Sequence, residues 1–122
     1  MEPKDLKERS LAFAVAVTAL CRGIHADWAA RRMADQLFRS ATSVAANDHA
    51  ACRGRSRREF IAKVGLVVEE AEETVFWLRF ALRTGMTEPV ASAALLEEAK
   101  QLLAIFTASA KTAAANEPRR GR

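Results

Sequence analysis

Two pairs of cysteine and histidine residues are the first groups in this chain that could bind a metal. Cys21 and His25 are four residues apart, a spacing that puts both on one face of a helix. His49 and Cys52, three residues apart, can do the same. Each pair, however, lies at the C-terminal end of a predicted helix, and the two helices are consecutive and antiparallel. Because a helix of about 24 residues is about 36 Å long, one chain cannot unite the pairs, and we expect no metal and no cofactor.

An acidic cluster is formed by Glu69, Glu70, Glu72 and Glu73. Spacings of three and four residues place some of these like charges side by side on a helix, which costs roughly a few tenths of a kcal/mol per pair. We therefore expect a basic group to face them, either Arg31, Arg32 or Arg39, or a residue of a second copy of the chain. A pair of catalytic carboxylates is conceivable, but a solvated or salt-bridged face is the simpler interpretation.

The remaining reactive groups form no recognisable catalytic arrangement. No serine or cysteine lies in a known nucleophile pattern, and the five glycines are too dispersed for a phosphate-binding loop. Neither histidine follows a glutamate by three residues, which argues against the Glu-x-x-His pattern of di-iron bundles. We therefore expect that the chain is not an enzyme.

The strongest chemical signal is a basic segment over residues 53–63. Its positive residues are Arg53, Arg55, Arg57, Arg58 and Lys63. Glu59 alone opposes them. They occupy a predicted loop and the first turns of a helix, and both arginines and helix N-termini favour phosphate groups. The basic segment is thus a candidate contact for RNA or DNA, and the alternative is a solvated loop that balances the acidic cluster.

Four amphipathic helices are needed to hold these groups. Apolar residues recur at spacings of three and four over residues of about 4–23, 27–52, 56–84 and 89–113. Asp27 is a good N-cap, Ser56 and Glu59 form a capping box, and Pro89 suits a first helical position. Loops of about 3–6 residues make consecutive helices antiparallel. We predict an all-α, antiparallel up-and-down four-helix bundle over 1–113, followed by a disordered basic tail over 114–122.

The third predicted helix is apolar on more than one side. Its main seam includes Val64 and Leu78, whereas Trp77 and Phe80 project in another direction, close to Phe76. A central helix with neighbours on two sides would explain this surplus. The alternative is a subunit interface that includes Phe76, Trp77 and Phe80, because large exposed apolar patches mark such interfaces. A closed ring of copies would cover them.

The composition fits one helical domain that needs no crosslinks. The chain has 122 residues, of which 50% are hydrophobic and 28% charged, with 5 Gly, 3 Pro and no Tyr. Two cysteines do not form a disulfide framework. The net charge of +4 permits a nucleic-acid partner without requiring one. No apolar run reaches the ~18–20 residues that span a bilayer, so we expect a cytoplasmic location and no membrane partner.

Three segments of the sequence carry a resemblance to a known family, namely QLFRSATSVAAN at 36–47, RSRREF at 55–60 and EEAEETVFWL at 69–78. They resemble the bacterial four helix bundle protein family, also known as large-subunit rRNA intervening-sequence proteins or labelled ribosomal-protein-like. The first segment resembles the second-helix signature of that family. The second is similar to its junction between the second and third helices, and the third is similar to the third helix of one branch. The likeness covers roughly 11–111 in the same order and spacing.

This resemblance implies an up-and-down bundle that assembles as a homopentameric ring. A related group, the accessory proteins of diversity-generating retroelements, shares the fold and binds nucleic acid and a reverse transcriptase. Many family members carry Ile-Ala-Glu-Gly after the signature asparagine, whereas Asp48-His49-Ala50-Ala51 follows Asn47 here. We therefore expect a homo-oligomer that binds nucleic acid through the basic segment. The alternative is a protein-interaction scaffold without a nucleic-acid role.

Overall fold

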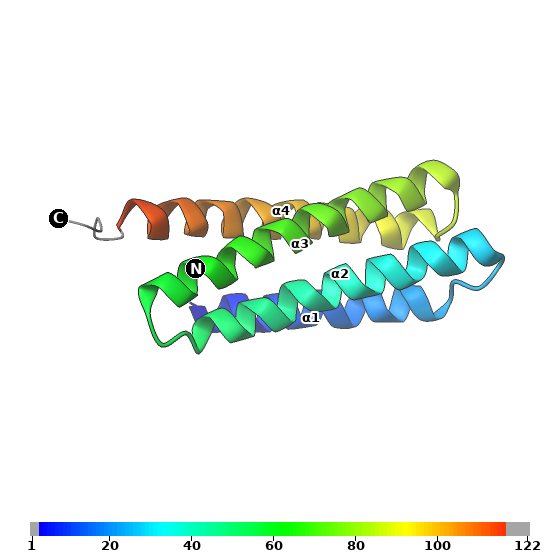
Figure 1. Cartoon of the computed structure of the whole chain (residues 1–122). Helices are drawn as coiled ribbons and strands as arrows, with labels where there is room; N and C mark the ends of the chain where they lie inside the picture. The colour runs from blue at the N-terminus through cyan, green and yellow to red at the C-terminus, as the bar shows by residue number, and fades with distance from the viewer. Residues whose placement is uncertain (1–2, 117–122) are drawn as a thin grey trace.

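The computed structural model describes residues 3–116, and within that range all regular secondary structure is helical. The four helices are α1 (Pro3–Arg22), α2 (Trp28–Cys52), α3 (Arg57–Thr84) and α4 (Pro89–Ala115). Consecutive helices run in opposite directions (Figure 1). The predicted all-α, four-helix architecture is confirmed. None of the helices in this range is both long and apolar enough to cross a membrane.

The helix ends differ from the predicted ends by one or two residues. Both α2 and α3 begin one residue later, because Asp27 and Ser56 are N-caps with extended backbones outside the helices. Helix α4 continues to Ala115, so the first two residues of the predicted disordered tail are helical. Residues 117–122, which hold the rest of that tail, lie outside the described range.

Side-chain caps define where three of the helices start. Asp27 Oδ1 accepts the N–H group three residues further on, at 2.8 Å. Ser56 Oγ accepts the Glu59 N–H at 3.1 Å, which is one half of the predicted capping box. The Glu88 carboxylate accepts the N–H groups two and three residues on, at 2.9 and 2.6 Å, with Pro89 as the first helical residue. These caps satisfy backbone donors that have no partner inside the helix.

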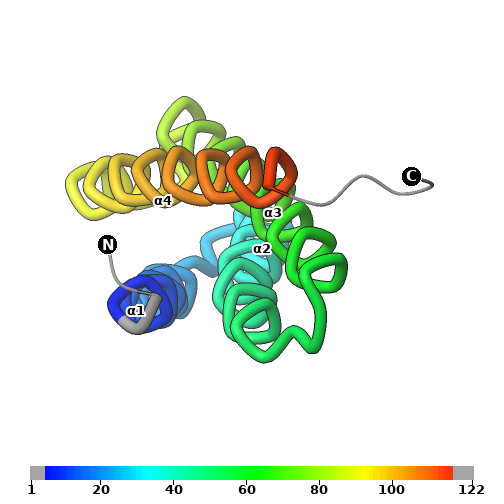
Figure 2. Tube along the Cα trace, turned by 90° about the vertical axis from the view of Figure 1, so that its left-hand side faces the viewer, coloured from blue at the N-terminus to red at the C-terminus, as the bar shows by residue number. Residues whose placement is uncertain are grey.

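The core runs along the middle of the bundle and draws on every helix. Its largest fully buried apolar side chains are Val17, Leu37, Val44, Val67, Leu78, Leu102 and Phe106. Helix α3 packs against both α2 and α4, and α1 packs mainly on α2. Figure 2 shows α3 and α4 tilted relative to α1. Burying each large apolar side chain contributes about 1.5–3 kcal/mol, so these packed faces supply most of the stability.

Two of the buried polar pairs join neighbouring helices within this apolar core. The hydroxyl of Ser10, the one polar residue in the α1 seam, donates to Asp48 Oδ2 at 2.9 Å. Ser10 is fully buried and Asp48 is 5% exposed. Thr74 Oγ1 lies 2.9 Å from Ser40 Oγ, and the Ser40 hydroxyl can also reach the backbone within its own helix. The pairs join α1 to α2 and α2 to α3, and each is satisfied as buried polar groups must be.

Burial raises the pKa of Asp48, although the hydrogen bond from Ser10 and the charges of His49 and Lys7 oppose the rise. The folded state therefore binds the Asp48 proton more tightly than the unfolded chain does. The resulting stabilisation is complete below the unfolded pKa of about 4. It is lost as the pH rises through the folded pKa.

We predict that Asp48→Asn removes this pH-dependent loss of stability, because the amide is never charged and can still accept a hydrogen bond from Ser10. The variant should become more stable relative to the wild type as the pH rises from 3.5 to 7. Urea unfolding followed by circular dichroism at several pH values measures the difference. Asp35→Asn, which removes an exposed carboxylate, is the matched control. A wild type and a D48N variant with parallel pH profiles would contradict the prediction.

We also predict that Phe106→Ala destabilises the fold by about 3–5 kcal/mol, since it opens a cavity among fully buried side chains. Leu66→Ala truncates a side chain of α3 that is 42% exposed, so it should lower the free energy of unfolding by well under half of that amount. Denaturant midpoints of both variants test this contrast. Equal losses would show that the packing described above is wrong.

Candidate nucleic-acid interface

The structure places the whole basic segment at one end of the bundle. Arg53 caps the C-terminus of α2, Arg55 lies in the loop, and the other three residues belong to the first two turns of α3. All four arginines are exposed and Lys63 is half-buried. The N-terminal end of α1 and the C-terminal end of α4 lie at the same end (Figure 1). Four helix termini therefore surround these positive side chains.

A groove of about 700 Å³ separates the α2–α3 loop from the last turns of α4. Arg55 and Arg57 line it on one side, and the hydroxyl-bearing residues Ser109 and Thr112 line it on the other. Phe60 supplies an apolar wall. Guanidinium and hydroxyl groups on opposite walls are suited to hold a phosphate group between them.

The other members of the basic segment lie outside this groove. Arg53 lines a smaller hollow of about 390 Å³ between α1 and α2, together with His49 and Leu11. Its Nη1 donates to the His49 carbonyl at 3.2 Å. Arg58 and Lys63 are on α3 outside the linings of both hollows. The structure thus brings Arg55 and Arg57 together and leaves the other three as flanking charges.

The positive charges of the basic segment are not neutralised within residues 3–116. None of the five forms an ion pair with a described carboxylate. Arg9, in contrast, donates two hydrogen bonds to Glu98 on α4, at 2.7 and 2.8 Å. The N-terminus of α3 adds its own partial positive charge. This end of the bundle therefore presents a positive field that an anionic partner can neutralise.

The acidic cluster is neutralised in part from the neighbouring helix. Arg39, one of the three expected partners, lies on α2 and pairs with both Glu70 and Glu73. Its hydrogen bond is the main cause of the lowered pKa of Glu73. Glu70 Oε2 accepts a hydrogen bond from Arg39 Nη1 at 3.3 Å. The other carboxylate oxygen, Glu70 Oε1, lies 3.2 Å from Arg39 Nη2, where the charges attract but the angle is too poor for a hydrogen bond. Two of the four glutamates of this face are therefore salt-bridged.

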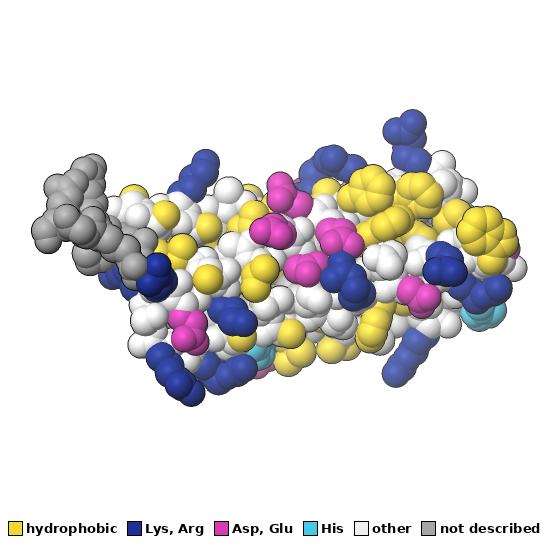
Figure 3. All heavy atoms as spheres, viewed as in Figure 1, with side chains coloured by type: hydrophobic (Ala, Val, Ile, Leu, Met, Phe, Trp, Pro, Cys, Tyr) yellow, Lys and Arg dark blue, Asp and Glu magenta, His cyan; other side chains and the backbone are white. Residues whose placement is uncertain are grey.

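Charge is unevenly distributed along the bundle. Figure 3 shows acidic side chains gathered at the middle of the visible face and basic side chains toward both ends. The middle holds the acidic cluster and Arg39, and the ends hold most of the arginines. Anionic partners should therefore approach the ends of the bundle.

Neither thiol is prepared to act as a nucleophile. The half-buried Cys21 has its Sγ 3.6 Å from the Ala34 carbonyl, and burial, followed by the charge of Asp35, raises its pKa to about 11. Burial also raises the pKa of the more exposed Cys52. Thiolates are consequently scarce at neutral pH. Among residues 3–116, no three His, Cys, Asp or Glu side chains are grouped so that they could hold a metal ion.

An aromatic cluster lies near the C-terminal end of α3. The ring centroid of Trp77 is 4.8 Å from that of Phe76 and 5.6 Å from that of Phe80. Helix α3 does have neighbours on two sides, as one explanation of its apolar surplus requires. Phe76 nevertheless remains 54% exposed and Phe80 37% exposed. The central position of α3 therefore accounts for its main seam and for only part of this cluster.

A second exposed apolar surface follows the groove between α1 and α2. Leu11 and Phe38 are 43% and 44% exposed there, and Val15, one turn from Leu11 on α1, is 62% exposed. Leu11 and Phe38 line hollows between these two helices. The surface differs in composition and position from the aromatic cluster on α3, so the bundle carries two unlike apolar surfaces.

Sequence reasoning did not find the α4 side of the basic groove. Ser109 and Thr112 are about fifty residues from Arg55 and Arg57 in the chain. Both hydroxyl residues lie in an Ala-rich helix, where they resemble ordinary surface positions. Their only distinguishing signal is a spacing of three, which puts them on one face of α4.

Comparison with known proteins identifies a family and a similar solved structure. The sequence pattern of the 23S rRNA-intervening sequence protein family matches residues 4–108. A solved structure from Bacteroides thetaiotaomicron, described as a protein with unknown function from the S23 ribosomal protein family, is also similar. It is 27% identical, has a TM-score of 0.81, and the match covers 91% of this chain and 99% of that one. No curated protein matches.

Both matches agree with the family resemblance of the three sequence segments at 36–47, 55–60 and 69–78. The matched residues include all of α2 and α3, nearly all of α1 and most of α4. The chain belongs to the 23S rRNA-intervening sequence protein family.

Proposed function

We propose that this chain is a non-enzymatic protein that binds nucleic acid through the basic segment and associates with copies of itself. The observation that carries the first part is the set of four exposed arginines at one end of the bundle, none of them paired with a described carboxylate. Arginine binds phosphate with a planar fork of donors. Several such groups around one groove match the repeating charge of a nucleic-acid backbone.

The choice of nucleic acid over other anions rests on the extent of the positive surface. Arg55 and Arg57 line the groove beside α4, and the flanking arginines extend the positive surface beyond it. A small anion would use the groove alone. The family name refers to an intervening sequence of 23S rRNA, which makes RNA the first nucleic acid to test.

A role without catalysis is supported by the state of the reactive groups. Two glutamates of the acidic cluster are engaged by Arg39, and the Cys21 thiol, with a pKa of about 11, stays protonated. The basic segment and the facing wall of α4 contain cations and hydroxyl groups but no histidine, and their one carboxylate is that of Glu59. Such a surface is suited to binding.

Self-association is supported by the two unlike apolar surfaces. If the aromatic cluster of one copy packs against Leu11 and Val15 on α1 of the next, the contact is heterologous, and such contacts close into rings when the rotation allows. This arrangement agrees with the homopentameric ring that the family resemblance implies. It would repeat the basic segment around one face of the ring and multiply the field.

We predict that replacing Arg55, Arg57 and Arg58 by Ala weakens binding of a single-stranded RNA by about tenfold or more at low salt. The slope of log affinity against log salt should fall by about 2, because up to three phosphate contacts are lost. Fluorescence anisotropy of a labelled 20-nucleotide RNA, between 50 and 200 mM salt, measures both quantities. The same titration with DNA gives the preference between the two.

The matched control is Arg79→Ala with Arg83→Ala and Lys100→Ala. It removes the same charge from exposed positions outside the basic segment. If both triple variants lose the same affinity, only net charge matters and the assignment of the basic segment is wrong. A wild-type chain that captures a protein partner but binds no RNA or DNA would favour the alternative of an interaction scaffold.

We further predict that Phe76→Ala with Phe80→Ala shifts the chain toward its monomer mass of 13.4 kDa without loss of helix. Sedimentation at micromolar concentration and circular dichroism measure the two properties. The control is Leu66→Ala, an exposed apolar residue on the same helix. A wild type that sediments as a monomer, or an unchanged mass in the double variant, rules the aromatic cluster out as the interface.

A further inference from the structure

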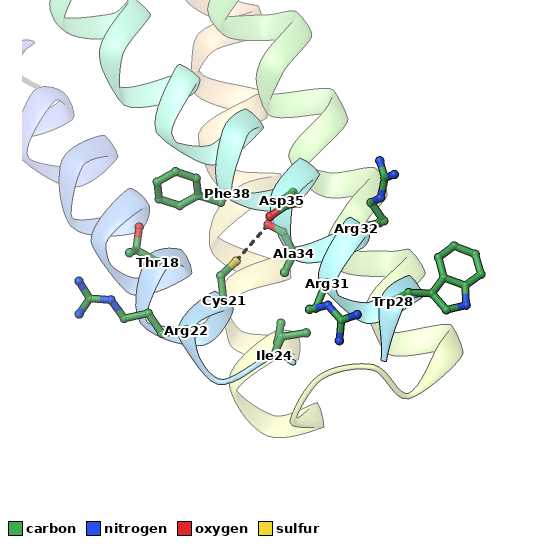
Figure 4. A pocket seen from close by; sticks show the side chains of 10 residues that line it. All are labelled: Thr18, Cys21, Arg22, Ile24, Trp28, Arg31, Arg32, Ala34, Asp35 and Phe38. Carbon is green, nitrogen blue, oxygen red and sulfur yellow. Dashed lines mark hydrogen bonds between the residues drawn. The ribbon is translucent and has the colours of Figure 1, made fainter. Parts of the chain in front are cut away.

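A second groove, of about 620 Å³, lies at the opposite end of the bundle from the basic segment. It runs between the last turns of α1 and the first turns of α2 (Figure 4). Three arginines contribute to its lining, namely Arg22, Arg31 and Arg32. Cys21, Ile24 and Ala34 lie between them in the same lining. No motif in the sequence marks this groove, because its arginines come from two helices and are separated by a loop.

The charge of this groove is predominantly positive. Its three arginines face a single carboxylate in the lining, that of Asp35, and none of them forms an ion pair with a carboxylate of residues 3–116. Asp27 is close in sequence, but its side chain accepts a backbone N–H group as the cap of α2. The Cys21 thiol in the lining is neutral at physiological pH. An anionic ligand therefore meets three cations and one anion.

Two exposed aromatic side chains accompany these cations. Trp28 is the first residue of α2 and is 72% exposed, and Phe38 is 44% exposed. Figure 4 shows the Trp28 indole directed outward at one edge of the groove, with Arg32 on the same side and Arg31 between Trp28 and Ile24. Unpaired nucleotides need a stacking surface for a base and hydrogen-bond donors for the phosphates. The solvent-exposed indole supplies the first, and the guanidinium groups of the groove supply the second.

We propose that this groove is a second nucleic-acid contact, which holds a single-stranded segment with one base stacked on Trp28 and the adjacent phosphates bound by Arg31 and Arg32. Arg22, across the groove, contributes a further phosphate donor. The segment is single-stranded because a base within a duplex already stacks on its neighbours and cannot offer a face to the indole. The assignment rests on this groove alone and does not depend on the basic segment.

The two contacts lie at opposite ends of α2. This helix has 25 residues, so the contacts are about 36 Å apart. The acidic cluster lies between them and disfavours a continuous path for a nucleic acid over the α2–α3 face. One copy of the chain can therefore hold two separate segments, either of one folded molecule or of two molecules.

Tryptophan fluorescence tests the proposal directly, because the chain has only two tryptophans. In a Trp77→Phe variant Trp28 is the sole emitter, and a single-stranded 10-nucleotide RNA should quench it saturably at low salt. The difference between the wild type and Trp28→Phe gives the same signal without altering the aromatic cluster. A duplex RNA with the same number of phosphates should quench Trp28 at least several-fold less.

The arginines are tested in the same assay. Arg31→Ala with Arg32→Ala should weaken the quenching titration about tenfold or more, whereas the matched pair Arg79→Ala and Arg83→Ala on α3 should change it less than threefold. In the background of Arg55→Ala, Arg57→Ala and Arg58→Ala the quenching should persist. This triple variant distinguishes the groove from the basic segment, because RNA binding at one contact can be lost while binding at the other remains.

Three outcomes would overturn the proposal. The first is the absence of saturable quenching of Trp28 by single-stranded RNA at 50 mM salt. The second is a quenching titration that the Arg31 and Arg32 substitutions leave unchanged. The third is a Trp28 emission that responds to protein concentration and not to RNA. Trp28 also lines a hollow with Trp77 and Phe80, so this third result would assign it to a contact between copies of the chain.

Discussion

Helix α3 lies between two neighbours, and the arrangement of the other helices depends on how it packs. One seam of this helix, which includes Val67 and Leu78, is fully buried, and both α2 and α4 pack on it. Its 28 residues extend over about 40 Å, from one end of the bundle to the other. The N-terminus of α3 therefore carries much of the basic segment, and its C-terminal half carries the aromatic cluster. A shift of α3 along its axis would move both.

The charge distribution follows from the same packing. In the middle of the bundle, side chains from adjacent helices lie close enough to pair, as Arg39 does with Glu70 and Glu73 and as Arg9 does with Glu98. At the ends the helices terminate, and the arginines of the loops and first turns extend into solvent without a described partner. Partly exposed ion pairs contribute little stability, so their main effect is to confine the uncompensated positive charge to the ends. Both proposed nucleic-acid contacts use these ends.

Local chemistry explains why much of the fold could be predicted. Apolar spacing identified four helices, and the caps Asp27 and Ser56, together with Pro89 at a first helical position, placed the starts of three of them within one residue. The same reasoning extended less well to the end of α4, where Ala114 and Ala115 continue the helix because alanine has the highest helix propensity. The five positions of the basic segment were also visible in the sequence, since a cluster of cations within eleven residues needs no tertiary contact to be seen.

The sequence by itself determined the helices and the position of the strongest basic segment, because each of these depends on residues within one or two helical turns. The short loops determined the helix directions, and three segments along the chain indicated the family. Only the tertiary structure decided which groups share a surface. It placed Thr112 opposite Arg57, paired Ser10 with Asp48, and left Trp28 exposed beside Arg32. These relations depend on how far each helix is rotated and tilted against its neighbour. Many side chains in contact across an interface determine that geometry together, and no local pattern of residues reveals it.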